Sequence, residues 1–201
     1  QAVSRPSEWQ QLAREARYED ALTAARRAGW DRLLSRLDER DLFALGETAR
    51  LAGAVNDALV VYRQVRARFE GTATAADAAF MIGRLKQAGG DVAGSLSWYE
   101  ICLRESPAGR SAPDAAGCRM EALHKTGDLD DAARAAADYL QKWPKGSYAA
   151  LAQQLDVVVF LLLLVAEIAG LDPDVEPVGE EPGVEGVLDG VGLDLGESDD
   201  G

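Results

Sequence analysis

Few side chains in this sequence could carry out catalysis or bind a metal. His124 is the single histidine, and Cys102 and Cys118 are the only cysteines. A catalytic triad or a multi-histidine metal site would have to be built around His124 alone, and the two cysteines lack the spacing of a zinc site. We therefore expect a solvated histidine and two independent buried thiols, with a disulfide in an oxidising compartment as the alternative for the thiols.

The remaining reactive groups also favour structural roles. The acid pairs Glu19-Asp20 and Asp130-Asp131 fall at predicted helix starts, where negative charge complements the helix dipole. The stretch GRLKQAGGD, residues 83–91, has the spacing of neither common phosphate-binding loop. The sequence predicts no enzyme, no cofactor, no metal and no small-molecule substrate; an enzyme built around His124 is the alternative.

Charge is divided unevenly along the chain. All 21 Lys and Arg residues lie at or before Lys145, together with 21 of the 34 Asp and Glu residues, so the formal net charge of -13 arises after that position. A neutral body has no basic stripe for nucleic acid, and an acidic tail is repelled by phosphate and by anionic lipid. We expect no nucleic-acid partner.

A 37-residue repeat positions most of these side chains. Its anchors are Ala16, Gly53, Gly90 and Gly127. The residues seven positions before the anchors are Trp9, Gly46, Gly83 and Met120. Apolar residues recur at spacings of three and four on both sides of an anchor, which predicts two amphipathic helices joined by a turn that needs positive φ.

The repeat predicts an all-α solenoid of helical hairpins. A single hairpin cannot bury both of its faces, so about 3.5 such units must stack on one another. We place the array at residues 1–155, with Pro107 and Pro144 ending second helices. The expected units lie near 7–37, 38–74, 75–111 and 112–146, with a capping helix at 147–155.

The composition changes after the predicted cap. Residues 156–170 form an apolar segment that we expect to be helical, but its run of ten apolar residues, Val157 to Ala166, is shorter than the roughly 18 needed to cross a bilayer. Residues 171–201 hold acids, glycine, proline and valine without a basic residue, which predicts a disordered acidic tail. The alternative is a shift of reading frame near residue 156, which would make this end an unselected sequence.

The repeat resembles the tetratricopeptide repeat (TPR). One unit fills the signature of that family with Gly46, Ala58, Tyr62 and Val65, and the next unit fills it with Gly83, Ser95, Tyr99, Cys102 and Pro107. The longer 37-residue period is similar to that of bacterial envelope proteins. The stretches WQQLAREARYEDALTAARRAGW and YLQKWPKGSYAALAQQL resemble the C-terminal repeat region of FecR-domain anti-sigma regulators. Those regulators carry a membrane span and a sensor domain upstream, so membrane contact is expected only through such an upstream segment.

The resemblance implies a partner-binding concave face made by the first helices of successive repeats. The positions carried over by alignment are Phe43, Glu47, Arg50, Phe80, Arg84, Gln87, Glu121, His124 and Lys125. Two aromatics among mixed charges suit an amphipathic helix or an extended peptide. In the alternative interpretation, Phe43 and Phe80 are core residues and the charges are solvated. Chaperone-binding members of the family clamp a carboxylate with Lys, Asn and Arg at these positions, and the different residues here predict no such clamp.

Together these patterns predict a non-enzymatic scaffold with a protein or peptide partner, and the resemblance places it within an envelope regulator. The alternative is a structural module that self-associates through the apolar segment 157–168. The expected location is the periplasm or the envelope, with the cytoplasm as the alternative. Because the chain starts at Gln1 without a methionine or a signal sequence, we expect a fragment or a processed product.

Overall fold

The computed structural model describes residues 6–157, and all regular secondary structure in this range is helical. The helices are α1 (Glu8–Arg14), α2 (Tyr18–Arg36), α3 (Glu39–Leu51), α4 (Val55–Arg68), α5 (Ala73–Ala88), α6 (Val92–Glu105), α7 (Ala112–Thr126) and α8 (Leu129–Lys142). Residues 149–157 are also helical. Most of the predicted apolar segment and all of the predicted acidic tail lie outside the described residues.

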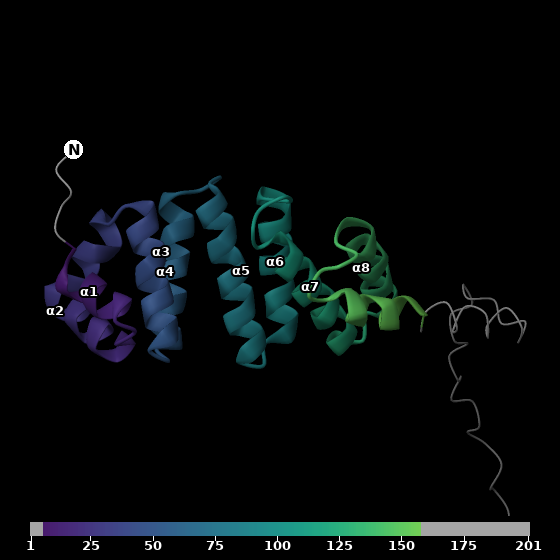
Figure 1. The fold of residues 1–201 in the computed structure, drawn as a ribbon, viewed down its shortest axis with the longest axis horizontal. Helices are drawn as coiled ribbons and strands as arrows, with labels where there is room; N and C mark the ends of the chain where they lie inside the picture. Colours follow the sequence, from purple (N-terminus) through teal and green to yellow (C-terminus); the bar gives the residue numbers. More distant parts are fainter. Residues whose placement is uncertain (1–5, 158–201) are drawn as a thin grey trace, which may run out of the picture. The chain divides into compact units, whose positions relative to one another are not determined.

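The helices form consecutive antiparallel pairs, α1 with α2 through α7 with α8, that follow one another in chain order (Figure 1). Each second helix also packs on the first helix of the next pair, as α4 does on α5 and α6 on α7. The predicted all-α solenoid of helical hairpins is therefore confirmed. Among residues 6–157, no helix is long and apolar enough to cross a membrane.

The turn inside each pair uses the left-handed backbone conformation that the repeat predicts. Gly53, Gly90 and Gly127 have φ of 73°, 90° and 89°. Ala16, at the equivalent position of the first pair, has φ 57° and is the one residue other than glycine with positive φ among residues 6–157. All four pairs therefore reverse direction by the same backbone geometry, which is strained in the first pair because alanine carries a Cβ.

The helices of each pair approach closely because one partner is small. A Cβ on Gly46 would lie 2.7 Å from Cε1 of Tyr62, and a Cβ on Gly83 would lie 2.6 Å from Cε1 of Tyr99. The outer pairs reverse this arrangement, with the large residue on the first helix and alanine on the second. Those combinations are Trp9 with Ala25 and Met120 with Ala136, and all four side chains are buried. Each pair therefore fills this part of the core with one large and one small residue, but the helix that carries the large residue differs between the inner and the outer pairs.

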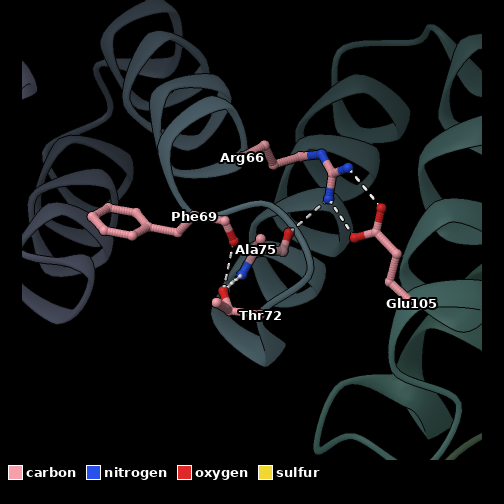
Figure 2. Close-up of polar contacts among 5 residues, drawn as sticks. All are labelled: Arg66, Phe69, Thr72, Ala75 and Glu105. Atoms are coloured by element: carbon pink, nitrogen blue, oxygen red, sulfur yellow. Dashed lines mark hydrogen bonds and ion pairs between the residues drawn. The ribbon is translucent and has the colours of Figure 1, made fainter.

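An arginine ties the second repeat to the third. Arg66 on α4 donates two parallel hydrogen bonds to the carboxylate of Glu105 on α6, at 2.8 and 2.9 Å, and a third at 3.0 Å to the carbonyl of Ala75 on α5 (Figure 2). The α4–α5 linker is held by Thr72, whose hydroxyl donates to the Phe69 carbonyl and accepts from the Ala75 amide. These contacts fix the junction from which α5 presents its side chains.

Candidate functional site

A groove with a volume of about 740 Å³ lies on the first-helix face, the face formed by α1, α3, α5 and α7. It is lined mainly by α1 and α3, with Thr74 and Asp77 from the start of α5 and Arg110 from the α6–α7 linker. Its volume lies within the range of ligand-binding clefts. Of the positions predicted to contact a partner, Phe43 and Glu47 line this groove.

Phe43 and Glu47 are held by side chains beneath them. The Phe43 ring lies 5.5 Å from the Tyr62 ring, centroid to centroid, and the Tyr62 hydroxyl donates to Glu47. Arg50 donates a second bond to Glu47 at 2.7 Å. Burial raises the pKa of Glu47, but the hydrogen bonds from Arg50 and Tyr62 outweigh it, so this pKa lies below its ordinary value and the carboxylate stays ionised.

Asp77 forms the buried acidic end of the groove. The residue is 8% exposed; its Oδ2 accepts a hydrogen bond from Nε of Arg110 at 2.7 Å, and its Oδ1 accepts one from the Ser111 hydroxyl at 2.6 Å. The Arg110 guanidinium carbon lies 5.7 Å from the centroid of the Phe43 ring. Arg110 therefore spans three elements: it leaves the α6–α7 linker, pairs with a carboxylate on α5 and stacks on an aromatic ring of α3.

The next repeat presents a different surface. Phe80 is only 6% exposed and packs in the core at 6.1 Å from the Tyr99 ring, so the expectation that it lines a binding surface is corrected. Its phenyl ring sits under the exposed Arg84, whose guanidinium carbon lies 5.9 Å from the ring centroid. Arg84 thus supplies the exposed surface at this point.

A polar chain continues from the third repeat to the fourth. The Tyr99 hydroxyl donates to Gln87 at 2.6 Å, Gln87 donates to Glu121 at 3.3 Å, and Lys125 donates to Glu121 at 2.6 Å. Three of the predicted positions, Gln87, Glu121 and Lys125, are therefore brought together across α5 and α7. They already satisfy one another, which leaves less hydrogen-bonding capacity for a partner.

His124 lies apart from both groups. It is exposed and lines a separate cleft of about 760 Å³ with Leu151, Leu155 and Val157 of the last helical stretch. Nearby, Tyr148 occupies the space above Gly117, the position that corresponds to Phe43 and Phe80 in the preceding repeats. An aromatic residue from the end of the array therefore completes this face in the fourth repeat.

Most of the groove residues other than Phe43 and Glu47 were missed by sequence reasoning, among them Asp77 and Arg110. Asp77 lies one 37-residue period after Arg40, which also lines the groove, so the repeat register itself could have identified it. Arg110 lies in a linker outside the helical pattern. Nothing in its local sequence signals that it returns to contact residues 33 and 67 positions earlier.

Reactive groups do not gather elsewhere on the part of the chain that the structure describes. Within residues 6–157, no group of three or more His, Cys, Asp or Glu residues could hold a metal ion. Cys102 and Cys118 are both buried and free. Burial raises the pKa of Cys102 to about 12, so its thiol stays protonated, and the Cys118 sulfur lies 3.1 Å from the Tyr148 hydroxyl.

Comparison with solved structures shows the same architecture in repeat proteins. The chain is similar to MamA, with a TM-score of 0.60 and 16% identity over 83% of this chain and 86% of that one. It is also similar to a tetratricopeptide repeat protein from Parabacteroides merdae, with a TM-score of 0.58 and 20% identity over 74% of this chain and 56% of that one. A third similar structure is the putative kinesin light chain of Podosopora anserina with nearly identical TPR-like repeats, with a TM-score of 0.57 and 13% identity over 81% of this chain and 90% of that one. No protein-family model and no curated protein matches the sequence.

These likenesses show a TPR-like fold. Stacked repeats of this kind form an extended concave surface. The similar structures do not identify a ligand for this chain, because the sequence identities are low and function depends on the individual binding site.

Proposed function

We propose that this chain is a non-enzymatic interaction module that binds a peptide or a helix of a partner protein along its first-helix face. The groove of about 740 Å³ between α1, α3 and α5 is the observation that carries this proposal. It combines an aromatic ring, Phe43, with fixed charges of both signs, and such a surface recognises side chains of an extended or helical peptide.

The rigidity of the groove supports this role. Glu47 is fixed by Arg50 and Tyr62, and the Ser111 hydroxyl orients Asp77. Charged groups held in one geometry lose little conformational entropy when a ligand arrives, so more of the interaction energy appears as affinity.

Selection of peptide ligands followed by calorimetry tests the proposal. Peptides displayed as a library are selected on the immobilised full chain, and their Kd values are then measured for the variants Phe43→Ala and Arg84→Ala. The matched control is Val60→Ala on α4, because Val60 is an exposed side chain of a second helix, 44% accessible. We expect one or both first-helix variants to weaken binding about ten-fold, which corresponds to about 1.4 kcal/mol, and the control to have no effect. Equal effects at all three positions, or no effect at any of them, would refute binding on the first-helix face.

The regulatory context is also a proposal. The likeness of the sequence to the repeat region of FecR-domain regulators supports a partner in the bacterial envelope, where the module would act beside a membrane-anchored sensor. Sequencing of the locus upstream of the codon for Gln1 checks this context directly. A coding region for a membrane span and a sensor domain in the same frame is the expected result, and an unrelated frame would remove this part of the proposal.

The cleft at the end of the array favours a second candidate function, self-association. Leu151, Leu155 and Val157 line this cleft of about 760 Å³, and Val157 is 54% exposed. Light scattering of the full chain over a range of concentrations gives its oligomeric state. A dimer that Leu151→Asp and Val157→Asp convert to a monomer would support this function, whereas a chain that is monomeric at all concentrations would exclude it.

A further inference from the structure

We propose that Asp77 and Phe43 form a pocket for a cationic side chain of the partner peptide, and that Arg110 fills this pocket as an internal stand-in for the ligand. The inference deepens the proposed function, on which it rests, by naming the chemistry of the residue that the groove recognises. It follows from the position of Arg110, which comes from a linker and lies in the groove rather than in the core.

The pocket has the chemistry of a guanidinium site. An ionised carboxylate that is mostly buried requires a cation or several hydrogen bonds, because desolvation of the charge is costly. Asp77 is 8% exposed and offers one oxygen, Oδ2, to a guanidinium at 2.7 Å. The same guanidinium stacks on the Phe43 ring, which adds a cation–π contact.

Arg110 is bound loosely for a residue in such a pocket. Its side chain is 71% exposed, and it gives Asp77 only its Nε–H, although guanidinium groups commonly bind carboxylates through two parallel bonds. The Asp77 carboxylate is shielded and must keep a cationic partner, whereas the Arg110 guanidinium is largely in water. An arginine of a partner peptide can therefore exchange with Arg110 and take both the carboxylate and the ring without leaving Asp77 unpaired.

The charges that remain favour a basic ligand. Asp38 and Asp41 also line the groove and form no ion pair with the other residues that the structure describes. When Arg110 leaves, these two carboxylates and Asp77 face the two lining cations Arg14 and Arg40, while Glu47 stays paired with Arg50. Removal of Arg110 therefore makes the groove more negative by one charge.

Ser111, the residue that follows Arg110, indicates what should follow the arginine in a partner peptide. The Ser111 hydroxyl donates to Oδ1 of Asp77, so both oxygens of the carboxylate are bound by consecutive residues of one segment. A partner peptide that places a hydroxyl residue directly after its arginine can reproduce both bonds. The linker itself supplies the sequence of a suitable probe, SPAGRSAP, residues 106–113.

The test is a titration with that octapeptide, acetylated and amidated, followed by the amide NMR signals of the full chain. The proteins compared are the unaltered chain, Arg110→Ala, the double variant Arg110→Ala with Asp77→Asn, and Arg68→Ala. The last is the matched control because Arg68 on α4 also stacks on a phenylalanine, Phe69, but does not line the groove. A peptide in which alanine replaces the arginine controls for contacts of the remaining residues.

We expect Arg110→Ala to bind the probe several-fold more tightly than the unaltered chain and Arg68→Ala to behave like the unaltered chain. The double variant and the alanine peptide should both lose this gain. Binding by Arg110→Ala that is no tighter, or that persists in the double variant, would overturn the proposal. If Asp77→Asn unfolds the chain, Arg110→Ala with Phe43→Leu replaces it, and an unchanged affinity in that variant is equally contradictory.

This result is separable from the test of the proposed function. Selected peptides that depend on Arg84 while the octapeptide fails would leave the interaction module intact and remove only the cation pocket. Conversely, octapeptide binding that needs Asp77, without any selected ligand sensitive to Phe43 or Arg84, would retain the pocket and remove the first-helix face as the binding site of the selected peptides.

Discussion

At the scale of the residue, the left-handed backbone conformation recurs at four equivalent positions, three of which are glycine and one of which is alanine. This conformation causes no strain at Gly53, Gly90 or Gly127, because glycine has no Cβ. At Ala16 the Cβ crowds the following carbonyl oxygen. The first pair thus carries a local strain that the other three lack.

Ala16→Gly should therefore stabilise the chain. Relief of the left-handed strain stabilises the folded glycine variant by roughly 1–2 kcal/mol. The greater conformational freedom of glycine in the unfolded chain offsets about 0.4–1 kcal/mol of this gain. We expect a net increase of about 0.5 kcal/mol in the free energy of unfolding, measured by urea denaturation. The control is Ala137→Gly, on the exposed side of α8, which should lose up to about 1 kcal/mol. A loss at both positions would show that Ala16 is not strained.

Gly83→Ala tests the close approach of paired helices. The new Cβ would lie 2.6 Å from Cε1 of Tyr99, and overpacking of this kind costs about 1–3 kcal/mol. The cost should shrink in a Tyr99→Leu background, because the ring that causes the clash is gone. Urea denaturation of the two single variants and the double variant gives the coupling energy. Additive losses would mean that the glycine is not required by the tyrosine.

At the scale of the element, the Arg66–Glu105 pair joins consecutive repeats rather than the two helices of one repeat. Both side chains are largely shielded, at 16% and 20% exposure, and the bidentate geometry is favourable. Hydrogen bonds from Arg66 lower the pKa of Glu105. A carboxylate with a lowered pKa in the folded state contributes stability above its unfolded pKa of about 4.3, and this contribution is lost as the pH falls through the folded value.

Glu105→Gln should therefore destabilise the chain in a pH-dependent manner. At pH 7 we expect a loss of about 1–2 kcal/mol in the free energy of unfolding, since a charge-assisted bond becomes a neutral one. The difference from the unaltered chain should be constant at neutral pH and should fade as the pH falls below the unfolded pKa of about 4.3 and through the lower folded value. Glu100→Gln is the control because Glu100 is 50% exposed and bonds to Arg119 at 3.2 Å, so its loss should stay below about 1 kcal/mol. A loss for Glu105→Gln that is constant with pH would contradict the role of its charge.

At the scale of the whole molecule, the repeat period predicts the fold but only part of the site. The spacing of Gly53, Gly90 and Gly127 is sufficient to predict the hairpins, because each glycine meets a backbone requirement of its own turn. The burial of the Phe80 side chain could not be predicted from the same repeat pattern. Phe43 and Phe80 stand at equivalent positions of the repeat, yet Phe80 is buried and Phe43 is half-buried.

Long-range contacts from linkers also escape a periodic pattern. Arg110 reaches the groove from outside the helices, and Tyr148 fills the space above Gly117 although it precedes the last helical stretch. Sequence periodicity reports which helix face is buried, whereas these side chains depend on where a non-repeating segment runs in space. In the groove, which repeat helices otherwise line, Arg110 is such a departure from the repeat.

The measurement that tests the central claim most directly is the mapping of a selected peptide ligand on the chain by amide chemical-shift changes. The account predicts that the largest changes cluster on α1, α3 and α5, around Phe43 and Asp77, and that α2 and α4 stay unaffected on their exposed sides. Changes confined to the second helices, or to the cleft around His124 and Val157, would contradict a binding groove on the first-helix face.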